Sequence, residues 1–326
     1  MSIESIGLKN FTVFEDFQLD VSSGINVFIG ENGTGKTHLL KALYAACELS
    51  KTGNKIEDLL KCFRENQQEG NLLRNKNIGQ LTISIFSKGI VTYKICEGKY
   101  SVEIPDGAKF LAVYIPVKDM LTHADGFLAM ANKYRDFPFD KTLTDIVIKA
   151  SQWKVKQPPK LALAILPILE EMMDGTVVFE NDEFYIKKNR GQMILFELEA
   201  EGLKKVGLLW QLLMTDNLDE DCILIWDEPE ANLNPKFLPR IVECLLELSR
   251  HGVQIFLSTH NYIFAKYFDV AKNENDSVLF HSLYFEEKTQ RVKCETQPYF
   301  ENLKHNDISA AFNELLERVY QIQIGD

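Results

Sequence analysis

The segment GENGTGKT (Gly30–Thr37) constrains the fold of this chain more than any other feature. It fits G-x-x-x-x-G-K-[ST], the pattern of a loop whose backbone N–H groups cradle nucleotide phosphates. The apolar run Ile25–Ile29 precedes it, and a helical apolar period over His38–Ser50 follows it. This is the strand–loop–helix context that phosphate binding at a helix N-terminus requires. The alternative, a glycine-rich turn without a ligand, does not need that context.

The positions of this loop have distinct expected roles. Lys36 would contact the β- and γ-phosphates, and Thr37 would ligate Mg²⁺ through its hydroxyl. The other predicted nucleotide-binding residues here are Asn32, Gly33, Thr34, Gly35 and, at the start of the helix, His38. ATP and Mg²⁺ are therefore the expected cofactors.

Two further strand ends carry polar groups that such a site needs. CILIWDEPE (Cys222–Glu230) predicts a buried strand after which Asp227 would hold Mg²⁺ through water and Glu228 would polarise the attacking water. An acidic cap on the following helix is the alternative. IFLSTH (Ile255–His260) predicts another buried strand, and its histidine would contact the γ-phosphate at the carboxyl edge of the sheet. The predicted catalytic residues are Glu228, His260 and Lys36.

Apolar patterns predict strands and helices that alternate along the chain. Strands are expected at Ser2–Leu8, Phe14–Val21, Ile25–Ile29, Gln80–Phe86, Ile90–Cys96, Tyr100–Ile104, Phe110–Ile115, Cys222–Trp226, Val253–Leu257, Ser277–Phe285 and Gln290–Glu295, with a hairpin at Thr176–Lys187. Helices are expected at His38–Ser50, Gly202–Thr215, Pro235–His251 and Ala310–Tyr320, with a polar helix over Asn54–Arg74 that runs into a loop. The alternation predicts an α/β P-loop NTPase fold with a mixed, mainly parallel sheet, N-terminal antiparallel strands and a helical insertion.

The same patterns predict one domain in three parts. Residues 1–116 form an N-terminal nucleotide-binding lobe, 117–173 a helical insertion, and 174–326 a C-terminal lobe. The middle part is assigned as an insertion because its pattern is helical and is interrupted by Pro138 and by the Pro158–Pro159 pair.

Composition narrows the classes of function. A net charge of −11 argues against a broadly basic surface for nucleic acid, although the basic clusters Trp153–Lys160 and Lys187–Gly191 leave local DNA contact open. The 6 cysteines are scattered without a Cys-x-x-Cys pair, which favours reduced thiols over a zinc site or disulfides. There is no signal pattern, and no apolar run approaches the roughly 20 residues of a membrane-spanning helix. We therefore expect a cytoplasmic protein without membrane contact.

The order of the P-loop, ILIWDEPEANLNP and FLSTH resembles the ABC-type ATPases of the SMC, RecF and OLD group. DEPEANLNP is most similar to the DEPE-type AAA-family ATPases, the AAA_15 and AAA_21 class, and YIPVKDMLTHADGFLAMANKY is similar to a segment of small bacterial members. The resemblance is specific over residues 1–50 and about 195–265. It implies conversion of ATP to ADP and phosphate by a homodimer or higher oligomer that sandwiches ATP between the P-loop of one subunit and the signature motif of another.

A signature-like segment, ELEAEGLKKVGLL (Glu197–Leu209), stands where this family has its signature motif. Gly202 matches the glycine of that motif and is counted as nucleotide-binding, but Ala200 or Glu201 stands where serine is expected. A carboxylate there would repel the partner's γ-phosphate unless it points away. An ordinary amphipathic helix start is the alternative. The Q-loop glutamine is not assigned among Gln80, Gln152 and Gln157.

Three functions are consistent with this resemblance. The first is a dimeric ATP-binding and hydrolysing switch that regulates or assembles with a separate effector, a nuclease or toxin, as in bacterial anti-phage defence or toxin-type systems. The second is a DNA-repair or recombination ATPase of the RecF or SMC type. The third, an ABC transporter subunit, is least favoured because the signature is imperfect, and a non-hydrolysing binding module also stays open.

Overall fold

The computed structural model describes residues 2–52, 57–63, 72–76, 80–87, 90–96, 99–104, 109–134 and 139–324. Its central sheet has six strands in the order β14-β13-β3-β12-β11-β7. These strands are β3 (Ile25–Gly30), β7 (Leu111–Ile115), β11 (Cys222–Asp227), β12 (Gln254–Ser258), β13 (Val278–Phe285) and β14 (Val292–Gln297). All neighbours are parallel except β14, which is antiparallel to β13. The predicted mixed, mainly parallel sheet is confirmed.

A second sheet is antiparallel and has the order β2-β1-β4-β5-β6. Its strands are β1 (Ser5–Phe11), β2 (Phe14–Asp20), β4 (Gln80–Phe86), β5 (Ile90–Cys96) and β6 (Lys99–Glu103). The N-terminal strands and the later meander, predicted separately, form one sheet because β4 pairs with β1. Alternate residues explain this pairing: Ile6 and Leu8 of β1 and Ile83 and Ile85 of β4 are buried on the same face.

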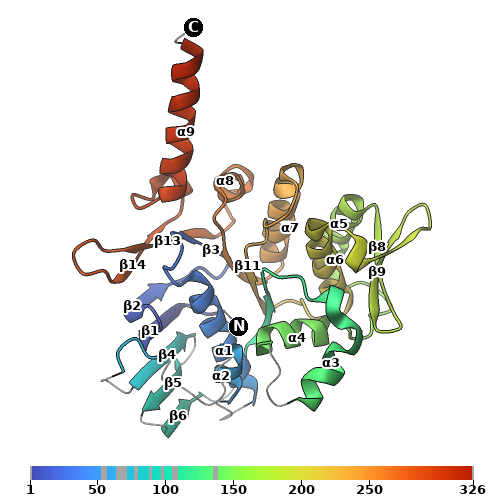
Figure 1. Ribbon diagram of the computed structural model, residues 1–326, viewed down its shortest axis with the longest axis horizontal. Coiled ribbons are helices and arrows are strands. Elements are labelled where there is room, and N and C mark those ends of the chain that lie inside the picture. Colours follow the sequence, from blue (N-terminus) through green and yellow to red (C-terminus); the bar gives the residue numbers. More distant parts are fainter. Residues whose placement is uncertain are drawn as a thin grey trace.

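Helix α1 (Lys36–Thr52) joins the two sheets (Figure 1). It contacts β4 and β5 of the antiparallel sheet and β3, β7, β11 and β12 of the central sheet. Leu40, Ala42 and Ala45 lie on different sides of α1 and are all fully buried, so the helix is apolar toward both sheets. The short α2 (Glu57–Cys62) packs against α1; most of the predicted helix over Asn54–Arg74 lies outside the described residues.

The other face of the central sheet is covered by helices. They are α3 (Ala124–Lys133), α4 (Lys141–Ala150), α5 (Leu166–Met173), α6 (Glu201–Met214), α7 (Leu238–Arg250) and α8 (Tyr262–Ala271). Short 3₁₀ helices lie at Leu121–His123, Lys160–Leu163, Phe196–Leu198, Pro235–Phe237 and Phe300–Asn302. A three-stranded sheet, β8 (Gly175–Glu180), β9 (Glu183–Lys188) and β10 (Met193–Leu195), lies beside α5 and α6 (Figure 1).

One apolar core connects these helices to the sheet. Leu224 of β11 and Leu257 of β12 belong to the same buried cluster as Ile146 of α4 and Leu169 of α5. The helices of residues 117–173 therefore pack into the main core. The division of the chain at residues 116 and 173 stays a prediction.

Among the described strands and α-helices, β10 and α8 were not predicted. Helix α8 is almost continuously apolar, so its sequence has no clear helical period. Its start signal is Asn261, whose side chain accepts a hydrogen bond from the Phe264 N–H at 3.0 Å.

Helix α9 (Asp307–Ile324) extends away from the rest of the molecule (Figure 1). It is anchored at its start, where the Phe312 ring stacks on Tyr262 at 4.0 Å between centroids. Farther along, Leu315, Tyr320 and Ile322 are more than half exposed. No helix within the described ranges is long and apolar enough to span a membrane.

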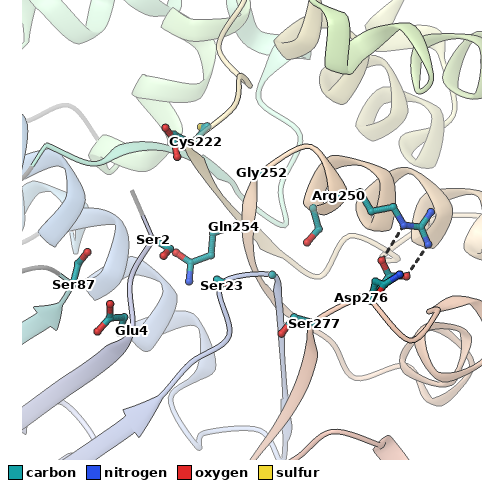
Figure 2. Close-up of a pocket in the computed structure, with 14 residues that line it drawn as sticks. Ser2, Glu4, Ser23, Ser87, Cys222, Arg250, Gly252, Gln254, Asp276 and Ser277 are labelled. Carbon is teal, nitrogen blue, oxygen red and sulfur yellow. Dashed lines mark hydrogen bonds and ion pairs between the residues drawn. The ribbon is translucent and has the colours of Figure 1, made fainter.

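The two edges of the parallel strands differ in what they expose. At the amino edge, Ser23, Cys222, Gln254 and Ser277 line a polar pocket (Figure 2). At the carboxyl edge, β3 leads into the predicted P-loop, and β11 and β12 end in Asp227 and Ser258, which are register partners. The predicted P-loop and the acids at the end of β11 therefore lie at the carboxyl edge.

Candidate functional site

The P-loop has the backbone that phosphate binding needs. It connects β3 to α1, and Gly30, Gly33 and Gly35 have φ of 138°, 87° and 93°, a region that side chains disfavour. A Cβ on Gly30 would lie 2.1 Å from the Leu283 carbonyl oxygen, so this position also requires glycine for space. In the described part of the chain, the N–H groups of residues 32, 33 and 35 donate to no protein acceptor. These donors are available at the positive end of α1.

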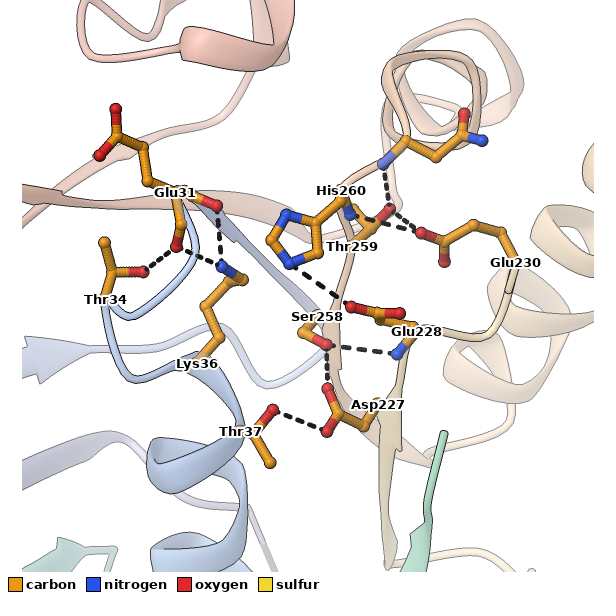
Figure 3. Close-up of polar contacts among 12 residues, drawn as sticks. Glu31, Thr34, Lys36, Thr37, Asp227, Glu228, Glu230, Ser258, Thr259 and His260 are labelled. Atoms are coloured by element: carbon orange, nitrogen blue, oxygen red, sulfur yellow. Dashed lines mark hydrogen bonds and ion pairs between the residues drawn. The ribbon is translucent and has the colours of Figure 1, made fainter. Parts of the chain in front are cut away.

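Lys36 lies over this loop. Its Nζ donates to the carbonyl oxygens of Gly30 at 2.7 Å and Glu31 at 2.9 Å, and the latter also accepts from Thr34 Oγ1 at 2.8 Å (Figure 3). Burial lowers the pKa of Lys36 to about 8, although the carboxylates of Glu228 and Asp227 act in the opposite direction. An anion at the loop would provide the charge partner that Lys36 has only at a distance in this structure.

Asp227 is the centre of a hydrogen-bond cluster at the end of β11. Its carboxylate accepts from Thr37 Oγ1 at 2.9 Å and from Ser258 Oγ (Figure 3). It also accepts from the buried Tyr114 hydroxyl at 3.3 Å. The adjacent hydroxyl and carboxylate of Thr37 and Asp227 are hard oxygen donors of the kind that Mg²⁺ prefers. No group of three or more His, Cys, Asp or Glu side chains within the described ranges could hold a metal alone. This donor pair suits a Mg²⁺ ion that takes its other ligands from phosphate and water.

Glu228 follows Asp227 in a left-handed conformation with φ of 50°. Its N–H donates to the carbonyl oxygen and to Oγ of Ser258, both at 3.2 Å, and its carbonyl oxygen accepts from Lys205 Nζ at 2.8 Å. These hydrogen bonds to the N–H and to the carbonyl oxygen of Glu228 stabilise a backbone conformation that is costly for a non-glycine residue. The side chain is directed toward His260, and Oε1 lies 3.4 Å from the imidazole Nε2 (Figure 3).

His260 follows β12 and completes the cluster. Partial burial and the positive charge of Lys36 lower the pKa of His260, although the carboxylates of Glu228 and Asp227 act in the opposite direction, so the neutral imidazole is favoured at pH 7. Its side chain is 37% exposed, which leaves the ring accessible to a ligand. Five predicted residues from three separate segments, Lys36, Thr37, Asp227, Glu228 and His260, are therefore gathered at one edge of the sheet. Their roles toward a nucleotide stay predictions.

His38 lies apart from this cluster. It follows Thr37 on α1, and its ring is directed at Phe63, with 6.1 Å between the ring centroids. Its predicted contact with the nucleotide stays a prediction, as do those of Asn32, Gly33, Thr34 and Gly35.

The start of α6 carries the signature-like segment. Gly202 is buried, and a Cβ there would lie 2.6 Å from the Asn232 carbonyl oxygen, so this glycine allows α6 to approach the loop after β11. The Glu201 carboxylate is 2.6 Å from Lys204 Nζ, which offsets its negative charge. Binding of a partner's nucleotide by Gly202 stays a prediction.

Sequence reasoning missed several residues of this site. Tyr114 is on β7, which lies next to β11, and its position inside an apolar run was the available signal. Thr259 lies within FLSTH, and its Oγ1 donates to Glu230 Oε1 at 2.5 Å. Lys205 could not be found from sequence, because only the packing of α6 brings its ammonium to Glu228.

Two family models match the chain. The first, described as "AAA ATPase domain", matches residues 1–152. The second, described as "AAA domain, putative AbiEii toxin, Type IV TA system", matches residues 118–265. The matches include the P-loop and the DEPE and FLSTH segments respectively.

Curated relatives are DNA replication and repair proteins RecF. The protein from Listeria welshimeri is 35% identical over 91 residues, 27% of this chain and 25% of the relative. The protein from Pediococcus pentosaceus is 23% identical over 224 residues, 64% of this chain and 59% of the relative. The match to the first of these relatives thus spans about a quarter of its length.

Solved structures with the same fold include heads of SMC proteins. The SMC head domain from Thermotoga maritima has a TM-score of 0.50 at 15% identity, over 91% of this chain and 99% of that chain. The Smc head from Pyrococcus furiosus, bound to the C-terminal domain of ScpA, has a TM-score of 0.56 at 13% identity, over 98% and 99%. These similarities confirm the predicted P-loop ATPase fold.

Proposed function

Because the chain is an ABC-type ATPase of the SMC and RecF group, we propose that it hydrolyses ATP with Mg²⁺ as a switch that acts on a partner protein. One observation carries the catalytic part of this proposal. The P-loop lysine, the Thr37–Asp227 pair and the Glu228–His260 pair converge at one edge of the sheet (Figure 3). The cluster holds a phosphate-binding loop, oxygen ligands for Mg²⁺ and a carboxylate that can accept a proton.

Each residue has a defined task in this reaction. The free N–H groups of the loop and the Lys36 ammonium bind the phosphates, and Thr37 and Asp227 would hold Mg²⁺. Mg²⁺ supplies charge neutralisation on the phosphate oxygens when it is bound. Glu228 accepts the proton of the attacking water, and the neutral imidazole of His260 beside it hydrogen-bonds the water or the γ-phosphate.

The test is the Glu228→Gln variant. Loss of the general base should lower turnover by roughly 10²- to 10⁴-fold, while ATP binding stays within about threefold of the parent, because the P-loop is intact. Phosphate release and equilibrium binding of labelled ATP measure the two quantities. If the parent protein binds Mg²⁺-ATP but never turns it over, the chain is a binding module and the enzymatic part of the proposal is wrong.

We also propose that two copies sandwich two ATP molecules. The signature-like start of α6 would then face the γ-phosphate of the partner's nucleotide, with Glu201 at the position of the usual serine. This arrangement predicts that Glu201→Ser, which removes a negative charge near the phosphate, increases the dimer fraction at a given ATP concentration. Sedimentation of the Glu228→Gln protein with and without ATP provides the baseline. An unchanged mass in every state would contradict the sandwich.

The partner in this proposal is a separate effector such as a nuclease or toxin, in a cytoplasmic defence or toxin-type system. The name of one matched family includes a toxin, and an SMC head of the same fold binds the ScpA C-terminal domain. Apolar side chains on α9, with Ile322 71% exposed, are available for such a contact. Co-purification with the products of neighbouring genes, followed by an ATPase assay, tests this part.

DNA binding is the second candidate function. The curated relatives include RecF proteins. Lysines of both basic clusters lie next to strand β8. Lys154 Nζ donates to the carbonyl oxygen of Val177 on β8, and Lys187 is the register partner of Thr176 on the same strand. Retention on DNA that weakens steeply with salt would favour this function, and no retention at low salt would exclude it.

A further inference from the structure

Glu230, the last acid of the DEPE segment, has no task in the reaction described above. It lies in a tight turn after β11, in which the Ala231 N–H donates to the Glu228 carbonyl oxygen at 3.1 Å and the Leu233 N–H to that of Glu230 at 3.0 Å. Glu230 is 8% exposed, and its side chain is directed toward the loop that follows β12 (Figure 3). It is therefore an acid buried between the two loops that carry Glu228 and His260.

The carboxyl group connects these loops. Its Oε1 accepts from Thr259 Oγ1 at 2.5 Å and from the His260 backbone N–H at 3.4 Å (Figure 3). Thr259 Oγ1 accepts in turn from the Asn261 N–H at 2.9 Å, and the Asn261 side chain caps α8. The backbone of His260 is thus held between Glu230 and the start of α8.

The same histidine contacts both acids of one turn. Its backbone N–H bonds Glu230, and its imidazole Nε2 lies 3.4 Å from the Glu228 carboxylate. A shift of the backbone at His260 would move the ring relative to Glu228. The distance between these catalytic groups therefore depends on the contact that Glu230 makes.

The surroundings of Glu230 disfavour a charged carboxylate, so stability alone does not explain an acid at this position. Its Oε2 is buried without a hydrogen-bond partner in the described residues. Burial raises the pKa of Glu230 to about 7, although the bond from Thr259 acts to lower it. An apolar side chain of similar volume would avoid this desolvation cost. What only a hydrogen-bond acceptor provides here is the contact to Thr259 and His260.

We propose that Glu230 is a positioning residue of the ATPase reaction, which fixes the backbone of Thr259 and His260 so that the imidazole stays beside Glu228. This inference rests on the proposed ATPase function. It predicts that Glu230 affects turnover through His260 and not through nucleotide binding.

The first test compares two substitutions at this position. Glu230→Ala removes the acceptor, and turnover should fall roughly tenfold to hundredfold while the ATP dissociation constant changes by less than about threefold. Glu230→Gln keeps an oxygen acceptor for both donors, and its turnover should stay within about threefold of the parent. Equal losses in the two variants would contradict the role of the hydrogen bonds.

A double-mutant cycle with His260→Ala distinguishes positioning from a general loss of structure. If Glu230 acts through the imidazole, Glu230→Ala should not slow a protein that already carries His260→Ala. If the two losses multiply in the double variant, the proposal is wrong.

The matched control is Gln254→Ala, which removes a buried polar side chain at the opposite edge of the sheet. It should destabilise the protein without a loss of turnover per folded molecule, and it shows whether lower stability alone slows the reaction. Parent-like turnover in Glu230→Ala would refute this role alone. No turnover in the parent with Mg²⁺-ATP would refute the proposed function and the role together.

Discussion

The two edges of the central sheet are both polar, yet only one has the properties of a reaction site. At the carboxyl edge, N–H donors of the P-loop have no acceptor in the described part of the chain, and Lys36 is buried without an adjacent carboxylate. At the amino edge, polar side chains bond one another, as Arg250 and Asp276 do (Figure 2), and others bond the backbone. Unused donors and a buried charge indicate a site for an anion, whereas polarity alone does not.

Gln254 illustrates the amino edge. Its Oε1 accepts from the Ile3 N–H at 2.8 Å, and its Nε2 donates to the carbonyl oxygens of Ile3 at 2.8 Å and Ser22 at 2.7 Å. Ser22 and Ser277 bond through their hydroxyls at 2.8 Å. These hydrogen bonds hold the N-terminal segment against the sheet, so we expect them to contribute to stability and not to catalysis.

The largest difference between the edges should appear in Lys36→Met. Loss of the ammonium removes the charge that we propose binds the phosphates, so turnover should fall by at least about 10³-fold and ATP binding should be lost. The free energy of unfolding should not decrease, because burial of the Lys36 ammonium destabilises the folded parent and the methionine removes that desolvation cost. Phosphate release, ATP titration and urea unfolding measure the three quantities. A clear loss of stability would mean that Lys36 is a structural residue, and the two edges would then not differ in function as described.

Gln254→Ala should show the opposite pattern. Three buried backbone groups lose their partners, so the free energy of unfolding should fall by about 3 kcal/mol. Turnover per folded molecule should stay within about twofold of the parent, because Gln254 is at the far end of β12 from His260. Urea unfolding and phosphate release on the same preparation check both. A large kinetic effect with unchanged stability would show that the amino edge takes part in the reaction.

The sequence predicted one edge much better than the other, for a physical reason. Lys36, Thr37, Asp227, Glu228 and His260 each lie within a few residues of an apolar strand, and parallel strands bring their carboxyl ends together. The partners of Gln254 lie 251 and 232 positions away along the chain, and no local pattern indicates them. Pairing of β4 with β1 escaped prediction for the same reason.

The carboxyl-edge prediction was incomplete where tertiary packing decides. Tyr114 contacts Asp227 because β7 pairs with β11, and Lys205 reaches Glu228 because Gly202 allows α6 to approach the loop after β11. Neither contact follows from a motif. A sequence motif identifies only the functional groups on its own segment. The residues that hold these groups in place lie on other helices and strands.

The pH dependence of ATP binding should test whether the charge of Lys36, at the carboxyl edge, binds the nucleotide. Burial lowers the pKa of Lys36 to about 8, and only its protonated form attracts phosphate. The ATP dissociation constant should therefore be nearly constant below pH 8 and rise above it, up to about tenfold per pH unit. Titration between pH 7 and pH 9.5 tests this, and Lys36→Arg, which does not titrate there, is the control. A flat profile in the parent would indicate that Lys36 keeps its charge in this range.

The smallest expected effect concerns the ion pair that borders the amino-edge pocket. Arg250 Nε and one terminal nitrogen donate to the two carboxylate oxygens of Asp276 at 2.9 and 2.7 Å, and the Arg250 side chain is 35% exposed (Figure 2). Solvent screening limits such a pair, so Arg250→Ala should lower the free energy of unfolding by about 1 kcal/mol at pH 7 and less in high salt.

The hydrogen bond and charge of Arg250 lower the pKa of Asp276, so this contribution is present above the unfolded-state pKa of an aspartate. It should disappear as the pH falls through the lowered folded-state value, where Asp276 becomes protonated. The difference in unfolding free energy between the parent and Arg250→Ala should therefore approach zero in acid, and ATP turnover at pH 7 should not change. A difference that persists after Asp276 is protonated would assign the effect to packing of the Arg250 side chain and not to its charge.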